Sequence, residues 1–302
     1  MLFRSRNHQD EILEKNEELL QQQEEILAQR DEIERKNLYL EQSRQIIADK
    51  NERMVSSIEY AQTIQDALLP EEEDLKKIFK DHFVIYLPKD IVSGDFYWTS
   101  SSKDYTHIAV MDCTGHGVPG SFMSLIGNTL LNQIVNEWQI KNPAIVLENL
   151  HEQLRKALKQ NEIGTKLHAS IDIGFVTIDY TNNKIMYSGA NRPLLVFTEK
   201  GLNKIPGDIR STGGFQPEHK RKFSNKEVDL ISPSCIYLTT DGFTDQMSPD
   251  KRKFGQKRLY ELLEQMHNKP MNVQKDILLN MLENHKNIED QLDDICIFGI
   301  KL

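Results

Sequence analysis

The sequence predicts an α+β protein in which a long N-terminal helix precedes a globular domain of packed β-sheets flanked by helices. Two observations support this prediction. Residues 10–69 contain neither glycine nor proline, and an apolar side chain recurs there at every seventh position. After Pro70 the pattern changes to short runs of period two separated by turn residues, which is typical of strands. We therefore expect a helical regulatory stalk over residues 1–69 and a globular domain over residues 70–302.

The stalk has the repeat of a coiled coil. An unbroken seven-residue spacing is typical of one seam of a left-handed coiled coil, and polar residues in the companion seam fix register at some cost in stability. We therefore expect a weak parallel homodimer in preference to a solvated single helix. The repeat comprises Ile12, Leu19, Ile26, Ile33, Leu40, Ile47, Met54, Ala61 and Leu68, and the companion seam comprises Asn16, Gln23, Arg30, Asn37, Arg44 and Asn51.

The globular domain should contain strands in runs, with helices in pairs between them. This order indicates sheet-on-sheet packing covered by helices, because regular βαβ alternation would give one parallel sheet. The strands are expected at 83–87, 95–99, 107–112, 169–179, 184–189, 194–198, 226–231, 234–240 and 295–300, and the helices at 121–138, 143–160, 257–267 and 273–285.

Charge and composition exclude several function classes. The net charge of -9 argues against a nucleic-acid or anionic-membrane surface, which would need a basic patch. No apolar run is long enough to cross a bilayer, and the N-terminus lacks the apolar core of a signal peptide. Three scattered cysteines form no disulfide framework or zinc pattern. We expect a cytoplasmic protein without direct membrane insertion, and any membrane sensor upstream would lie outside this sequence.

Aspartates stand at the ends of predicted strands. Asp95 opens one strand, Asp112 and Asp241 each end one, and Asp293 and Asp294 directly precede the last. Carboxylates that converge from several strands would repel one another unless cations neutralised them. Oxygen ligands are those that Mg²⁺ and Mn²⁺ prefer. Each motif alone is equally well explained as a turn, because Asp-Gly is common in turns, but together they predict a metal site.

These motifs carry a family resemblance. From about residue 58 to the end, the chain resembles the SpoIIE/RsbU-type serine phosphatases of the metal-dependent protein phosphatase (PPM, protein phosphatase 2C-like) superfamily. Each motif is short, and the ordered set with its spacing is specific. The matching segments are Ile64–Pro70, Ser93–Tyr97, Asp112–Gly120, Thr240–Gly242 and Asp293–Cys296.

The resemblance implies a two-sheet antiparallel β-sandwich with paired helices on its outer faces, and a site for two Mn²⁺ or Mg²⁺ ions. It implies that Asp112 bridges both metals and that the backbone carbonyl of Cys113 binds the second. Asp241 and Asp293 match ligands of the first metal, and Asp95 matches an acidic residue near the second. Asp112 and Asp241 would then act in catalysis through a metal-activated water.

Two further residues are candidates with weaker support. His116 could protonate the leaving group, although its place in Gly-His-Gly is explained better by a tight turn from strand to helix. The phosphate-binding arginine of eukaryotic members has no evident counterpart, and Lys89 is a weak candidate for that role.

The resemblance implies a phosphoserine or phosphothreonine substrate on a signalling protein, commonly an anti-sigma-factor antagonist. A catalytically inactive scaffold that binds a partner as a dimer is the alternative. Metal binding would separate the two.

Overall fold

The computed structural model describes residues 2–162, 167–198, 201–214, 221–230 and 233–302. The chain divides into two compact units, Met1–Ser57 and Ile58–Leu302. Within the described ranges, every helix is either too short or too polar to span a bilayer.

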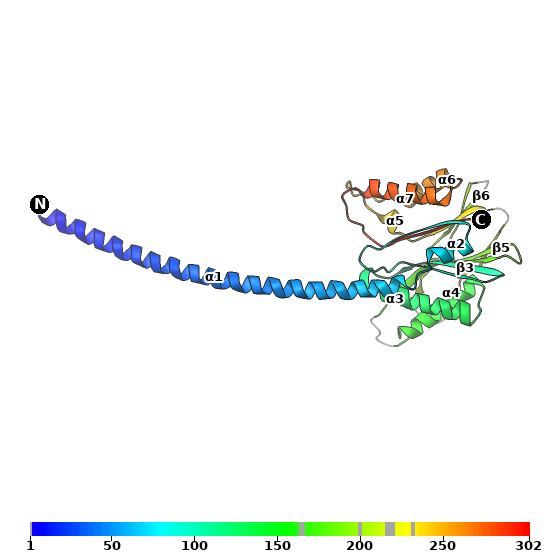
Figure 1. Cartoon of the computed structure of the whole chain (residues 1–302), viewed down its shortest axis with the longest axis horizontal. Helices are drawn as coiled ribbons and strands as arrows, with labels where there is room; N and C mark the ends of the chain where they lie inside the picture. The colour runs from blue at the N-terminus through cyan, green and yellow to red at the C-terminus, as the bar shows by residue number, and fades with distance from the viewer. Residues whose placement is uncertain (1, 163–166, 199–200, 215–220, 231–232) are drawn as a thin grey trace. The chain divides into compact units, whose positions relative to one another are not determined.

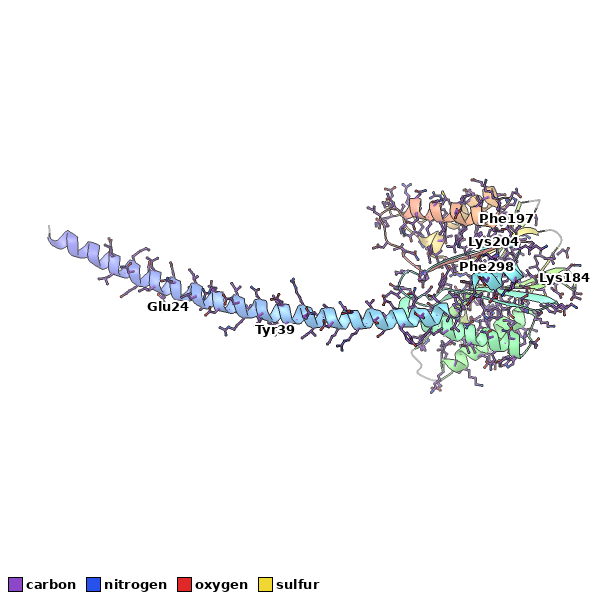
Figure 2. All side chains as sticks on the ribbon, viewed as in Figure 1. Glu24, Tyr39, Lys184, Phe197, Lys204 and Phe298 are labelled. Carbon is purple, nitrogen blue, oxygen red and sulfur yellow. The ribbon has the colours of Figure 1, made fainter. Side chains whose placement is uncertain are left out.

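The first unit consists of one helix, which continues into the second unit. Helix α1 extends over Leu2–Asp66, so the predicted long N-terminal helix is confirmed. The apolar seam of the seven-residue repeat faces solvent, with Ile26, Ile33 and Leu40 each more than half exposed. Figure 2 shows the side chains of this helix, such as those of Glu24 and Tyr39, projecting away from its axis. These side chains are therefore available to a partner helix, and the pairing of the seam with a second copy stays a prediction.

The second unit contains two antiparallel sheets. One has the strand order β1-β11-β10-β6-β7, and the other has the order β2-β3-β4-β5-β9, with β8 paired to β4. The two-sheet sandwich is therefore confirmed, and the short strands β7 and β8 add to the predicted ones. The strands are β1 (Asp81–Leu87), β2 (Phe96–Ser101), β3 (Tyr105–Cys113), β4 (Ser170–Asp179), β5 (Lys184–Ala190), β6 (Leu194–Thr198), β7 (Gly201–Ile205), β8 (Thr212–Gly213), β9 (Lys226–Asp229), β10 (Pro233–Thr239) and β11 (Ile295–Lys301).

Helices cover both outer faces of the sandwich, with α3 and α4 on one side and α6 and α7 on the other (Figure 1). Asn142 caps α4 by accepting hydrogen bonds from the backbone N–H groups of Ala144 and Ile145, and Pro143 occupies the first turn. The predicted helix over 121–138 begins earlier, at Gly117, and ends in a π-helical segment. The helices of this unit are α2 (Glu72–Ile78), α3 (Gly117–Leu131), the π-helix η1 (Asn132–Glu137), α4 (Pro143–Ala157), α5 (Gly242–Asp245), α6 (Gln256–Met266) and α7 (Met271–Lys286).

The alternation along each strand builds three apolar layers. In β11, Ile295 and Ile297 pack toward α6 and α7, whereas Cys296 and Phe298 enter the layer between the sheets. A strand with both faces covered reads as a continuous apolar run, as Ile295–Ile300 does. The equivalent alternation in β3 and β4 decides which of their polar side chains face the second sheet.

Candidate active site

The candidate site lies where β3 ends and β4 begins, beside the other sheet. Asp112 pairs directly with Asp172 in the antiparallel ladder of β3 and β4. Their neighbours Met111, Cys113 and Ile171 pack in the layer under α3 and α4, so period two directs both carboxylates to the opposite face. That face looks toward the second sheet, in which Asp241 follows β10 and Asp293 precedes β11.

Arg192 joins the carboxylates of the two sheets. It lies in the connection from β5 to β6, where the chain passes from one sheet to the other. Its Nη2 atom donates hydrogen bonds to Asp112 Oδ2 and, at 2.9 Å, to Asp241 Oδ2. Asp172 Oδ2 lies 3.8 Å from the same nitrogen. One guanidinium group thus contacts three carboxylates from three different parts of the chain.

The loop before β2 places Asp95 at the rear of this cluster. The Thr240 hydroxyl donates to Asp95 Oδ2 at 2.6 Å and accepts from the Cys296 backbone N–H at 2.9 Å. Asp95 is almost fully buried. Gly94 permits the close packing, because a Cβ there would lie 2.4 Å from the carbonyl oxygen of Gly115 and 3.2 Å from that of Cys113. The Cys113 carbonyl therefore lies on the loop that packs against the Asp95 loop.

The two aspartates before β11 have different surroundings. Asp294 is buried, and its two oxygens accept hydrogen bonds from the backbone N–H groups of Lys89 and Gly94, each at 2.7 Å. It therefore ties the loop that carries Asp95 to the start of β11. Asp293 is more exposed and lies within electrostatic reach of Asp241 and Lys89. These contacts suit Asp294 for a structural role, whereas Asp293 accepts a hydrogen bond from the Asp294 N–H at 2.9 Å and lies close enough to the cluster to feel its charge.

The cluster carries more negative charge than its arginine offsets. Burial raises the pKa of Asp112 to about 7; Arg192 counteracts this effect and the charge of Asp241 adds to it. Burial, followed by the charge of Asp112, holds the pKa of Asp95 well above its usual range. Burial also raises the pKa of Asp293. Closely spaced, poorly hydrated carboxylates of this kind ionise together only when additional cations are present.

His116 and Lys89 form a single hydrogen-bonded unit with Asp90. The Nδ1 atom of His116 lies 2.6 Å from Asp90 Oδ2, and its Nε2 atom lies 3.1 Å from Lys89 Nζ. Because an ammonium can only donate, Nε2 accepts from Lys89 and Nδ1–H donates to Asp90. The three residues line a pocket of about 880 Å³ together with Ile58, Ile91, Val92, Gly115, Gly117, Val118 and Pro119.

The donor set fits hard divalent cations. It consists of carboxylate oxygens with surplus negative charge, next to backbone carbonyls on a glycine-rich loop. Throughout the described part of the chain, no three His, Cys, Asp or Glu side chains converge closely enough to enclose a metal ion. Between Asp112 and Asp241 lies the Arg192 guanidinium. A metal shared by these two carboxylates would therefore have to take the place of the guanidinium.

The structure brings several of the predicted residues together. Asp112 and Asp241 share a hydrogen-bond partner, Asp95 lies behind Asp112, and Asp293 lies near Asp241. Their roles as ligands, like those of the Cys113 carbonyl and His116, stay predictions.

Sequence reasoning missed two residues of the cluster, Asp172 and Arg192. The signal for Asp172 was a lone charge inside the apolar strand Ser170–Phe175. Arg192 follows a strand end in Asn-Arg-Pro, and an isolated arginine in such a loop gives no comparable signal.

Comparison with known proteins identifies the family. Residues 102–302 match the family model of Stage II sporulation protein E (SpoIIE). Phosphoserine phosphatase RsbU of Bacillus subtilis is 31% identical over 215 residues, which are 68% of this chain and 58% of that protein. Protein IcfG of Synechocystis is 26% identical over 244 residues, 72% of this chain and 37% of that protein. The chain thus spans between about a third and three fifths of the length of these curated relatives.

Comparison with solved structures is consistent with this assignment. The structure of the SiaA-PP2C domain of Pseudomonas aeruginosa matches 83% of this chain and 98% of that domain, with 28% identity and a TM-score of 0.74. The match includes both sheets and the helices on their outer faces, because it spans 98% of that domain. The chain belongs to the SpoIIE family, and its Ile58–Leu302 unit has the fold of a PP2C-type phosphatase domain.

Proposed function

We propose that this chain is a metal-dependent protein-serine/threonine phosphatase that removes phosphate from a signalling protein. The observation that carries the proposal is the convergence of Asp112, Asp172 and Asp241 on one cation, Arg192. Carboxylates gathered from separate elements at a sheet edge destabilise the fold unless cations offset their charge. Their retention at such a position supports a cation-binding function.

Asp112, Asp241, Asp293, Asp95 and the Cys113 carbonyl would hold two Mn²⁺ or Mg²⁺ ions. When bound, such ions lower the pKa of a shared water and offset charge on the phosphoryl group. The protein's own contribution is to hold its carboxylates in fixed positions before substrate arrives. The hydrogen bond from Thr240 fixes Asp95, and the ladder with β4 fixes the backbone of Asp112.

His116 serves this site best as a positioning residue for Lys89. Its Nε2 lone pair is occupied by the Lys89 ammonium, and its Nδ1–H is held by Asp90. Lys89 keeps two further N–H donors, and its charge reaches Asp293. In this arrangement Lys89 supplies positive charge and protons at the edge of the cluster, and His116 fixes its direction.

The substrate class follows from the family. RsbU bears the name phosphoserine phosphatase, and we propose a phosphoserine or phosphothreonine on an anti-sigma-factor antagonist as the substrate here. We also propose a cytoplasmic location. The exposed seam of α1 supports a homodimer through a parallel coiled coil, through which an upstream sensor could act.

Gln65 connects the end of α1 with the site. Its side chain is buried, and its Nε2 atom donates to the Ser93 carbonyl at 2.7 Å and to the Ser124 hydroxyl at 2.8 Å. Its Oε1 atom accepts from the Ser93 N–H at 3.0 Å. Ser93 immediately precedes Gly94 and Asp95, so a movement of this helix end would move the Asp95 loop. We propose this contact as the route by which the stalk regulates the site.

Phosphate release tests the proposal. The chain with Mn²⁺ should hydrolyse p-nitrophenyl phosphate and a phosphorylated antagonist protein, and chelation should abolish both reactions. An inactive scaffold is the alternative, and calorimetric titration separates the two because a scaffold need not bind Mn²⁺. A chain that neither binds Mn²⁺ nor releases phosphate would contradict the proposal.

A further inference from the structure

We propose that Arg192 binds the substrate phosphoryl group and that its guanidinium competes with metal cations for the oxygens of the carboxylate cluster. This inference rests on the proposed function and adds a substrate-binding residue to it. It also assigns the role of the phosphate-binding arginine to a position that the sequence motifs do not contain.

The guanidinium is placed as an ion-binding group. Its side chain is only 12% exposed, and one nitrogen, Nη2, makes all the contacts to Asp112, Asp172 and Asp241. The Nε–H is buried and has no hydrogen-bond partner among the described residues. A buried donor without a partner destabilises the fold. An arginine recruited only to pair with these carboxylates would gain by using that donor as well.

The backbone of Arg192 is fixed, so only the side chain can relocate. The Tyr187 hydroxyl donates to the Arg192 carbonyl. A Cβ on Gly189 or Gly207 would come within 2.3 or 2.4 Å of the same carbonyl. Asn191, with a positive φ of 57°, donates through its side chain to Asp172 at 2.9 Å. Rotation about the side-chain bonds therefore moves the guanidinium while its anchor stays beside the carboxylates.

A guanidinium can bind either the carboxylates of the cluster or a phosphoryl group. Its planar N–H groups bind carboxylates and phosphoryl oxygens equally well, often in pairs. Cations taken up by Asp112 and Asp241 would compete for the oxygens that Nη2 now contacts and would repel its charge. The guanidinium displaced from the carboxylate oxygens would still be anchored beside them, and it could then bind a phosphoryl group at the site. Metal and phosphate should therefore bind with positive coupling.

Two binding measurements on Arg192→Met test the proposal. The first is the Mn²⁺ affinity without phosphate, by calorimetry, and the second is the affinity of the Mn²⁺-saturated protein for inorganic phosphate. We expect Mn²⁺ to bind about 10-fold more tightly because its competitor is gone, and phosphate to bind about 10- to 100-fold more weakly because charge-assisted hydrogen bonds are lost. Arg192→Lys should recover part of the phosphate affinity. Arg210→Met, at an exposed position in the same unit, should behave as the parent.

Each outcome decides one part of the proposal. Unchanged phosphate affinity in Arg192→Met would overturn the substrate-binding role, and unchanged or weaker Mn²⁺ binding would overturn the competition between the guanidinium and metal cations. If that variant does not fold, the parent protein provides the test, because saturating phosphate should tighten Mn²⁺ binding by the same factor by which Mn²⁺ tightens phosphate binding. No coupling in the parent would refute the proposal. If the Mn²⁺ and phosphate affinities change as expected but the protein releases phosphate from no phosphoprotein, only the proposed function would be contradicted.

Discussion

Replacing Gln65 by alanine is the sharpest test of how the helix end supports the site. Gln65 is 2% exposed, and its amide satisfies both the N–H and the C=O of Ser93. The substitution removes the hydrogen bonds that Gln65 makes to the N–H and to the C=O of Ser93 at the same time. The Ser93 carbonyl keeps a weak contact with the Ser124 hydroxyl at 3.4 Å, but the buried N–H loses the partner that Gln65 supplies.

The expected loss in unfolding free energy follows from the unsatisfied Ser93 N–H. A buried donor left unsatisfied costs about 1–3 kcal/mol of unfolding free energy. A domain of this size loses roughly 2–4 °C in Tm per kcal/mol, so Gln65→Ala should lower the Tm by roughly 2–12 °C. Because Ser93 lies next to Gly94 and Asp95, we also expect weaker Mn²⁺ binding and slower phosphate release.

Thermal unfolding with and without Mn²⁺ measures both effects. Gln45→Ala is the matched control, since Gln45 lies on the same helix and makes only an exposed contact with Asp49 at 2.9 Å. Gln65→Glu keeps the acceptor for the Ser93 N–H but loses the donor to its carbonyl, so it isolates the second half of the contact. A Tm equal to that of the parent would refute the energetic reasoning. A lowered Tm with unchanged Mn²⁺ affinity would show that Gln65 does not support the Asp95 loop.

Three further predictions concern the site, the stalk and the core. Asp241→Asn should lower Mn²⁺-dependent turnover by more than about 100-fold, and full turnover would contradict the mechanism. Replacing Ile26, Ile33 and Leu40 with Asp should make the chain monomeric in sedimentation and remove regulation; a monomeric parent would contradict the coiled coil. Burial lowers the pKa of His107 to about 4, so stability should fall between pH 6.5 and 4, by at most about 1.4 kcal/mol per pH unit. His107→Gln should flatten this slope, and an unchanged slope would refute the assignment.

Local patterns were sufficient to predict most of the fold. The run Ile295–Ile300 has apolar side chains at successive positions, and the structure covers both faces of β11. The Pro143 signal placed the start of α4 correctly because the capping contacts are made by residues next to it. The strands β7 and β8 were missed because neither is an apolar run of strand length, and their pairing with β6 and β4 forms them.

The candidate site could be predicted only as far as its residues carry local signals. Asp241 is followed directly by Gly242 and Asp112 precedes the glycine-rich segment that starts at Gly115, both at strand ends, so their sequence context marks them. The position of Asp172 opposite Asp112 depends on the register of the β3–β4 ladder, which a shift of one residue would reverse. The contacts of Arg192 span 80 residues to Asp112 and 49 to Asp241. Arg192 acquires these partners because the chain passes between the two sheets at this point, so its contacts depend on the topology rather than on any motif. For that reason binding experiments on Arg192 examine the part of the site that sequence comparison alone leaves undefined.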